Sequence, residues 1–194
     1  MSESWFARPT LTGTHVRLEP LCDDHIDALV AAVDDPRIFH WTSVDISDRK
    51  DAATFVRTAN EDPTRLAYAQ IDLATDILVG STSYYLIDPR NRCLAIGHTW
   101  LSRSAQGTLI NADSKLLLLR RAFEDLGAVR VEWHTDERNA HSRGAIAKLG
   151  AEFEGILRKH RRRRDGSWRN TALFSMTDDD WPRVCPRLQA RVEG

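Results

Sequence analysis

The sequence predicts a single α/β (α+β) domain, residues 1–194, with a central mixed, mostly antiparallel sheet and helices on both faces of that sheet. Segments 66–72, 77–87 and 93–102 are rich in β-branched and aromatic residues and are separated by turn residues, which is typical of an antiparallel meander. After Gly107 the apolar period changes to that of a helix and then back to that of a strand. A chain of 194 residues with 42% hydrophobic residues can bury one substantial core.

Before the meander, the sequence predicts an edge strand, two helices and an aromatic loop. Residues 11–21 alternate apolar and polar side chains as an edge strand does, and Asp23 or Asp24 then caps a first helix. A second helix is expected over about 48–60, where apolar residues recur at helical spacing. The loop between the two helices contains Phe39, His40 and Trp41.

After the meander, the pattern predicts further helices and a long hairpin. In chain order we expect a helix that Gly127 ends, a strand at 129–135, a helix capped by Asn139, a hairpin at 153–177 that turns at Asp165-Gly166, and a short last helix at 178–192 interrupted by Pro182 and Pro186. Proline interrupts a helix because it lacks the backbone donor that a helix interior requires.

The composition excludes membrane and disulfide-rich classes of protein. Residues 1–20 include charged side chains where a secretory signal is apolar, and no later run approaches the roughly 18 apolar residues of a membrane span. We therefore expect a soluble, cytoplasmic protein with no membrane partner. The three cysteines are Cys22, Cys93 and Cys185. Because they are odd in number and far apart, they suggest neither a disulfide framework nor a metal site.

A basic run interrupts an otherwise acidic chain. Residues 158–164 hold six of the 27 lysines and arginines and no acid, which leaves 21 basic against 28 acidic residues elsewhere. This separation indicates a local anion-facing surface, for an acidic acceptor, for phosphates or for RNA, and argues against a general nucleic-acid partner. A solvated guard at the edge of the sheet explains the run equally well.

A loop that leads into a helix has the features of an anion site. Its residues are Gln106, Gly107, Thr108, Leu109, Ile110 and Asn111. A helix start presents unpaired N–H groups and the positive end of the helix dipole, which suits a pyrophosphate. Lys115, in the first turn, would neutralise the same anion. An ordinary capped core helix with Lys115 in solvent is the alternative.

Three segments of the chain resemble the RimJ/RimL-type, ribosomal-protein-alanine branch of the GNAT superfamily of acetyltransferases. They are QGTLINADSKLLLLRRAFEDLGAVRVEWHTDERNAHSRGAIAKLGAEFEGILRK, the opening LTGTHVRLEPL and the closing DGSWRNTALFSM, so the resemblance covers essentially the whole chain. It implies the GNAT fold, with a V-shaped splay between two central strands. It also implies acetyl-CoA as cosubstrate, without a metal, and a primary amine as acceptor, with a ribosomal protein as one candidate partner.

The same resemblance implies that the loop holds the coenzyme A pyrophosphate through its backbone amides. In the superfamily the loop reads Q/R-x-x-G-x-G/A; here Gln106 matches the first position, and Leu109 and Asn111 occupy the two glycine positions. Glycine permits a positive φ and close approach of a phosphate, whereas leucine adopts a positive φ poorly. A weakened coenzyme site is the expected consequence of Leu109.

The splayed strand is implied to contact the pantetheine arm. It contains His98, Thr99 and Trp100, and in this family it diverges from the strand over 130–135. A free N–H on that strand would supply an oxyanion donor. Ordinary strand packing is the alternative for His98 and Trp100.

A second coenzyme contact is implied at the start of the next helix. Asn139 and Ser142 match the family's N-x-x-S, in which the asparagine contacts the coenzyme and the hydroxyl lies near the departing sulfur. Without the resemblance, Asn139 is equally well explained as a helix cap.

The acceptor must present a neutral amine, and direct transfer to it needs no enzyme nucleophile. An α-amine with a pKa near 8 is roughly a tenth neutral at pH 7, whereas a lysine near 10.4 is almost entirely charged, so a weak base suffices for a peptide N-terminus. Several family members have a glutamate on the splayed strand, but Leu94 and Ala95 stand here. The candidate catalytic residues are Ser142, as a proton relay, and His98, His134 and Asp136, as bases.

The identity of the acceptor stays open at this stage. Candidate acceptor contacts are Phe39, His40, Trp41 and Trp168. Protein N-termini are favoured by the resemblance, and small amines such as amino acids, polyamines or antibiotics are the alternative. A non-catalytic acyl-CoA-binding protein and an RNA-binding module are hypotheses of another class. A homodimer is expected only in so far as two-fold dimers are the commonest soluble oligomers.

Overall fold

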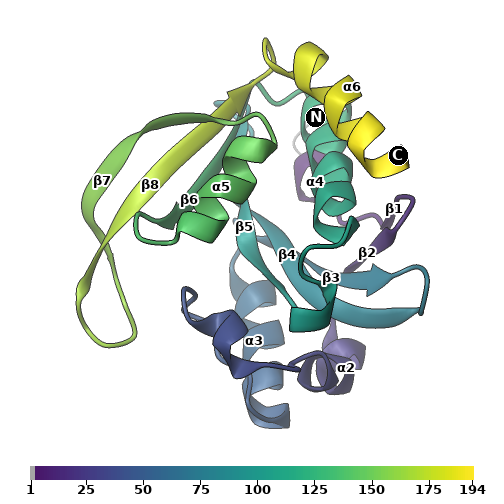
Figure 1. Ribbon diagram of the computed structural model, residues 1–194, viewed down its shortest axis with the longest axis vertical. Coiled ribbons are helices and arrows are strands. Elements are labelled where there is room, and N and C mark those ends of the chain that lie inside the picture. Colours follow the sequence, from purple (N-terminus) through teal and green to yellow (C-terminus); the bar gives the residue numbers. More distant parts are fainter. Residues whose placement is uncertain (1–2) are drawn as a thin grey trace.

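The computed structural model describes residues 3–194, which form an eight-stranded sheet with helices on both faces (Figure 1). The helices are α1 (Glu3–Phe6), α2 (Ile26–Ala31), α3 (Arg49–Glu61), α4 (Ile110–Arg120), α5 (Ala140–Lys148) and α6 (Trp181–Glu193). The strands are β1 (Leu11–Thr12), β2 (Val16–Pro20), β3 (Leu66–Asp72), β4 (Ile77–Asp88), β5 (Cys93–Leu101), β6 (Arg130–Asp136), β7 (Glu152–Arg162) and β8 (Trp168–Thr177). The sheet order is β1-β2-β3-β4-β5-β6-β8-β7, and the parallel pair is β5 with β6. The predicted mixed, mostly antiparallel α/β fold is confirmed.

The centre of the sheet opens between β5 and β6. These two strands pair only at their beginnings, and the register ends where Ala95 lies beside Glu132. Beyond this point the edge of β5 that faces β6 has no strand partner. On its other edge, β6 stays paired with β8 up to Asp136. The V-shaped splay between two central strands is therefore present.

A β-bulge lies on the diverging part of β5. Gly97 pairs with Ser83 and Trp100 pairs with Ser81, so His98 and Thr99 together stand opposite Thr82. His98 takes a positive φ of 49° to accommodate the extra residue. A bulge increases the local twist and redirects side chains, which helps β5 turn away from β6.

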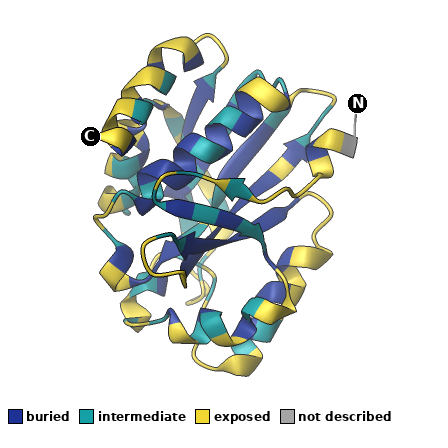
Figure 2. Cartoon of the chain, turned by 90° about the vertical axis from the view of Figure 1, so that its right-hand side faces the viewer, coloured by how far each residue is buried: buried dark blue, intermediate teal, exposed yellow. Residues whose placement is uncertain are grey.

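Two apolar layers cover the two faces of the sheet, and alternate residues of the strands feed each layer. On one face α4, α5 and α6 pack against strand residues that include Tyr68, Tyr84 and Trp133. On the other face α2 and α3 pack against residues that include Ala69 and Trp100. Figure 2 shows the buried residues gathered in the strands and on the inner sides of the helices.

The predicted strand at 11–21 is two strands, β1 and β2, joined by a tight turn in which the N–H of Gly13 donates to the carbonyl of Val16. The cause is the carboxylate of Asp113 on α4, which is 1% exposed. Asp113 accepts hydrogen bonds from the N–H groups of His15, at 2.6 Å, and Val16, at 3.2 Å. A Cβ at position 13 would lie 2.4 Å from this carboxylate, so the turn requires glycine.

Two helix ends differ from the expectation. The turn before α2 begins at Cys22, whose backbone and side chain both contact Nδ1 of His25, so neither Asp23 nor Asp24 is the cap. The last helix, α6, runs unbroken through Pro186. It persists because a buried apolar stripe on α6 packs against α4 and compensates for the missing backbone hydrogen bond.

The helix expected to end at Gly127 is α4 followed by a π-helical segment, Arg121–Asp125, and the start of the expected aromatic loop is a 3-10 helix, Pro36–Phe39. Most of the remaining predicted elements agree with the structure. Asp48 caps α3 and Asn139 caps α5. The hairpin of β7 and β8 turns at Gly166, where φ is 81°. Within residues 3–194, no helix is long and apolar enough to cross a membrane.

Candidate functional site

The open side of the splay is flanked by the N-termini of two helices. β5 leads through the loop into α4, and β6 leads through a short turn into α5, so both helices begin beside the diverging ends of these strands (Figure 1). Both helices pack on the same face of the sheet. Two helix N-termini at one opening make an electropositive site suited to a phosphate group.

The loop before α4 is built without the backbone conflict expected at Leu109. Gly107 has a φ of 82°, whereas Leu109 has a φ of −76° and already lies in the right-handed helical region. Asn111 is the second residue of α4 and is likewise not among the residues with positive φ. The concern that Leu109 strains the loop is therefore wrong, because the residue that requires glycine is Gly107.

The same loop leaves the start of α4 ready for an anion. No side chain in the described chain caps α4, and the hydroxyl of Thr108 accepts a long hydrogen bond of 3.3 Å from the N–H of Ile110. A Cβ at Gly107 would meet nothing within 4 Å, which leaves the loop backbone open to a ligand. These features fit the coenzyme A pyrophosphate.

Lys115 lies elsewhere than expected. Its side chain is 5% exposed, and its Nζ atom donates to the hydroxyls of Thr82 and Thr99 at 3.0 Å each. Burial lowers the pKa of Lys115 to about 7. The ammonium group therefore sits in the core under β4 and β5, where it supports the bulge rather than the loop before α4.

Asn139 and Ser142 lie together at the start of α5. The Oδ1 atom of Asn139 accepts a hydrogen bond of 3.0 Å from the N–H of Ser142. The cap occupies Oδ1 and leaves the side-chain amide for another acceptor. The cap role and the implied coenzyme role of Asn139 are thus compatible.

On the opposite face of the sheet, the splay is lined by aromatic and imidazole rings. Tyr85 packs edge-on against His98, at 5.0 Å between ring centroids, and against His134, at 5.9 Å. His134 in turn contacts His160 at 5.7 Å. Tyr85 also lies against Gly97, where a Cβ would be 2.7 Å from the Tyr85 ring, so glycine is required beneath it. We call Tyr85, His98, His134 and His160 the ring cluster.

A carboxylate lies at the point where β5 and β6 begin to diverge. It belongs to β6, whereas in the sequence we looked for a glutamate on β5. Glu132 of β6 lies beside Ala95 of β5, and it accepts a hydrogen bond of 2.9 Å from Nε2 of His134. The hydrogen bond from His134 and another from Arg130 lower the pKa of Glu132, against the effect of burial. The second ring nitrogen of His134, Nδ1, is buried and unpaired within residues 3–194.

The other two predicted bases have different surroundings. His98 is exposed, yet the protein atoms around its ring, together with the charges of Arg65 and Arg161, lower its pKa to about 4. Asp136 is buried and accepts hydrogen bonds from the guanidinium of Arg163 at 2.8 and 3.2 Å. Burial would raise the pKa of Asp136, but the bonds with Arg163 and the backbone of Arg138 lower it.

The four aromatic residues expected at the acceptor site fall into two groups. Phe39 is 1% exposed and packs edge-on against Trp100, so both belong to the core layer under α2 and α3. His40, Trp41 and Trp168 are exposed. The guanidinium of Arg138 lies 6.0 Å from the Trp41 ring, and Arg164 at the hairpin tip forms an ion pair with Asp45. The 39–47 loop and the hairpin tip therefore meet.

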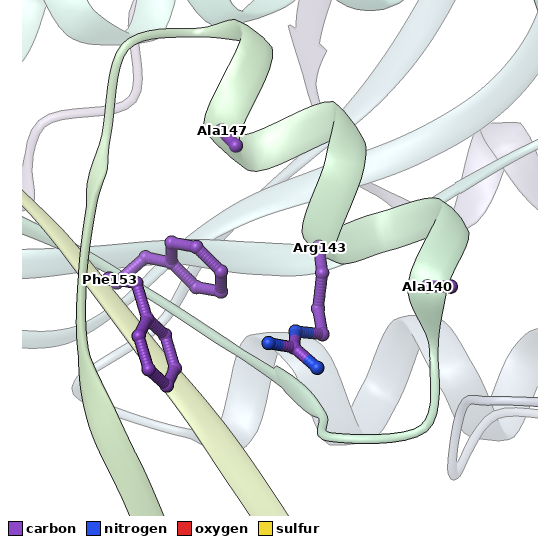
Figure 3. Close-up of a pocket in the computed structure, with 5 residues that line it drawn as sticks. Ala140, Arg143, Ala147 and Phe153 are labelled. Atoms are coloured by element: carbon purple, nitrogen blue, oxygen red, sulfur yellow. The ribbon is translucent and has the colours of Figure 1, made fainter.

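An apolar pocket lies beside α5. It is an open apolar hollow between α5 and β7, lined by Ala140, Arg143, Ala147, Phe153 and Phe174 (Figure 3). The Arg143 guanidinium lies 5.5 Å from the Phe153 ring. This pocket contains no carboxylate or imidazole, and one end of it borders the start of α5, next to Asn139 and Ser142.

Sequence reasoning missed Tyr85, Glu132 and His160. The spacing of Glu132 and His134, two apart in a predicted strand, was the available signal, because such residues share one face. Tyr85 and His160 become neighbours of His134 only through strand pairing that no local pattern encodes. Among residues 3–194, no group of three or more His, Cys, Asp or Glu side chains is arranged to hold a metal ion.

Comparisons with known proteins agree with this geometry. The acetyltransferase (GNAT) domain family matches residues 15–152. A GCN5-related N-acetyltransferase from Brucella melitensis is 31% identical, with a TM-score of 0.91 over 96% of this chain and 86% of that chain. A protein from T. thermophilus that is assigned to the acetyltransferases is 34% identical, with a TM-score of 0.88 over 95% and 98% of the two chains.

A more distant structure shares the fold. Mycobacterium smegmatis RimJ in complex with CoA-disulfide is 18% identical, with a TM-score of 0.77 over 98% of this chain and 96% of that chain. Among curated proteins, none matches the chain. From its family match, its relatives and the splayed sheet, the chain belongs to the GNAT family of acetyltransferases and is an acyl-CoA-dependent N-acetyltransferase.

Proposed function

We propose that this enzyme transfers the acetyl group of acetyl-CoA directly to the α-amine at the N-terminus of a protein or peptide, with a ribosomal protein as the first candidate. The observation that carries the proposal is the hydrogen-bonded pair of Glu132 and His134, at the point where β5 and β6 begin to diverge. Because Glu132 fixes the proton of His134 on Nε2, Nδ1 is left as an acceptor. A single imidazole base suits an α-amine, whose pKa near 8 leaves little proton affinity to overcome.

The coenzyme would supply an activated acetyl thioester, held by the N-termini of α4 and α5. Gly107 and the first amides of α4 would bind the pyrophosphate, and the amide of Asn139 would contact the pantetheine arm. A free N–H on the bulged part of β5 would donate to the thioester oxygen as charge develops on it. This assignment leaves Lys115 beneath the bulge as its support.

In the transfer step, the new bond joins the amine nitrogen to the acetyl carbon, and the bond from that carbon to sulfur breaks. His134 takes the proton that the amine loses, and Ser142 supplies or relays a proton to the departing thiolate. His98, with a pKa of about 4, is too weakly basic to compete for the amine proton at neutral pH. Asp136 holds Arg163 and the hairpin instead.

The two competing hypotheses, a non-catalytic acyl-CoA-binding protein and an RNA-binding module, are less well supported. A binding protein without catalysis was suggested by Leu109 and by the lack of a strand carboxylate, and Leu109 is unstrained while Glu132 supplies the carboxylate. An RNA-binding module is less favoured, because two arginines of the basic run, Arg163 and Arg164, pair with acids of the same chain and are not available to phosphates.

The test is acetylation of a peptide that contains both a free N-terminus and an internal lysine, compared with spermidine and with an aminoglycoside. We expect acetyl-CoA-dependent thiol release with the peptide, and mass spectrometry should place the acetyl group on the α-amine. Glu132→Gln should lower kcat by about tenfold or more while leaving the KM for acetyl-CoA unchanged. A higher kcat/KM with spermidine or with the aminoglycoside would overturn the assignment of the acceptor.

A further inference from the structure

Three arginines beside the ring cluster have no acidic partner. Arg65 precedes β3, Arg161 is near the end of β7, and Arg169 is on β8. No carboxylate of residues 3–194 forms an ion pair with any of them, in contrast to the paired Arg130 and Arg163. We call Arg65, Arg161 and Arg169 the unpaired arginines.

Arg65 is the most buried of the three. It is 8% exposed, its Nε atom donates to the hydroxyl of Ser83 at 3.0 Å, and its guanidinium lies 5.5 Å from the Phe55 ring. One terminal nitrogen of the guanidinium is buried and has no partner among the described residues. Burial lowers the pKa of Arg65 to about 10. A buried donor of this kind lacks an acceptor.

Arg161 and Arg169 face each other across the hairpin. They occupy directly opposite positions in the antiparallel pair of β7 and β8. Like charges in opposite positions destabilise a sheet unless an anion lies between them. Arg169 has a neutral neighbour, since its Nε atom donates to the hydroxyl of Thr171 at 3.1 Å. The pair therefore presents two positive charges to the same space.

All three arginines act on the ring cluster. Arg65 and Arg161 add to the burial that lowers the pKa of His98. Arg161 and Arg169 are close enough to Tyr85 and His160 to affect the pKa of both. Positive charge therefore converges on the face of the splay opposite α4 and α5, where the acceptor amine must approach.

The acids on this face are already engaged. Glu132 pairs with Arg130 and His134, and Asp136 pairs with Arg163. Asp62, which lies near Arg65 and His98, accepts hydrogen bonds from the N–H and hydroxyl of Thr64 at 2.8 Å each. None of these carboxylates forms an ion pair with the unpaired arginines: Asp62 acts on Arg65, and Asp136 on Arg169, only through longer-range attraction of charge. The anion that would contact the arginines directly is therefore expected to come from the ligand.

We propose that the acceptor carries a carboxylate close to its amine, and that the unpaired arginines bind this carboxylate and hold the amine against the ring cluster. Guanidinium groups recognise carboxylates through paired hydrogen bonds. A cationic acceptor such as a polyamine would be repelled. The proposal rests on the proposed function, and it specifies an N-terminus with Glu or Asp among its first two residues.

The experiment compares two peptides that differ only in Glu or Gln at the second residue. With the wild type, we expect kcat/KM to be about tenfold or more higher for the Glu peptide. In the double variant Arg161→Gln, Arg169→Gln, this ratio should fall below about threefold. Arg158→Gln, which removes an exposed charge from the same strand, should preserve the ratio. Because each ratio is measured on one protein preparation, partial unfolding of a variant cancels.

The outcomes separate this proposal from the proposed function. Equal kcat/KM for the two peptides, with acetylation of both, would overturn the acidic preference and leave N-terminal transfer intact. Acetylation of free glutamate and of neither peptide would overturn the peptide assignment and support the carboxylate. If the double variant keeps the wild-type ratio of kcat/KM for the Glu and Gln peptides, Arg161 and Arg169 do not bind the carboxylate.

Discussion

The ammonium group of Lys115 lies in the core directly beneath β5, the strand that we propose contacts the thioester. It is held by two threonine hydroxyls, of Thr82 and Thr99, and these hydroxyls also contact each other at 2.8 Å. Thr99 belongs to the bulge, so the three polar groups fix the bulged backbone from below. This arrangement lowers the free energy of unfolding, because burying a charged amine without a carboxylate is unfavourable.

Lys115→Met should therefore stabilise the protein in a manner that depends on pH. The folded pKa of about 7 lies below the unfolded value of 10.5, so between these values the unfolded chain binds more protons and the stability of the wild type rises with pH. The variant has no such group. Its advantage should be on the order of 5 kcal/mol below pH 7, less the lost hydrogen bonds, and should shrink as the pH rises.

Urea unfolding at pH 6, 7.5 and 9 measures this difference. Coenzyme affinity of the variant should stay within about threefold of the wild type, since Lys115 does not reach the loop before α4. An advantage that is the same at all three pH values would contradict the buried, titrating ammonium.

At the scale of elements, α5 shows how one residue serves both fold and site. Asn139 caps the helix through Oδ1, and we propose that its amide contacts the coenzyme. Asn139→Ala should lower the free energy of unfolding by about 1 kcal/mol, because the cap is lost. Asn139→Ser should restore most of that stability, since serine is also a good cap. Both variants should raise the KM for acetyl-CoA, because both lack the amide.

Thermal unfolding together with initial rates separates the two roles of Asn139. If the serine variant recovers both stability and KM, the asparagine acts through the cap alone and makes no coenzyme contact. If it recovers neither, serine does not cap α5 here.

Most elements follow from local patterns in the sequence. The strands of the meander, the caps Asp48 and Asn139 and the turn at Gly166 were predictable because their signals lie within a few residues. The break in the first strand was not predictable, since it depends on Asp113, about a hundred residues away. Likewise, Pro186 stays inside α6 because of packing that only the assembled fold supplies.

At the scale of the whole molecule, we propose that the sheet separates the coenzyme from the acceptor. The helix N-termini that suit the coenzyme lie on one face, and the ring cluster and the unpaired arginines lie on the other. The splay between β5 and β6 is the gap in the sheet that connects these two faces. The hairpin tip, tied to the 39–47 loop through Arg164 and Asp45, closes one side of the acceptor face.

The site was only partly predictable from the sequence, because half of it depends on the arrangement of the whole sheet. The loop before α4 and the N-x-x-S segment are each contiguous in the sequence, so residues for the proposed coenzyme half could be suggested from the sequence, although Lys115 among them lies in the core. The acceptor half combines residues from β4, β5, β6, β7 and β8. Its members, including Tyr85 and Arg169, are brought together by strand order and register alone.

The central claim, that acetyl-CoA binds with its pyrophosphate at the start of α4, is tested most directly by calorimetric titration of Leu109→Asp against Leu109→Asn. Leu109 is only partly buried, and aspartate and asparagine have nearly the same size, so any loss of packing is common to the two variants and the comparison isolates the charge. The aspartate places a negative charge beside the pyrophosphate and should weaken binding by about tenfold or more. The asparagine variant should bind within about threefold of the wild type. Equal affinities for the two variants, or no binding of acetyl-CoA to the wild type at millimolar concentration, would contradict the claim.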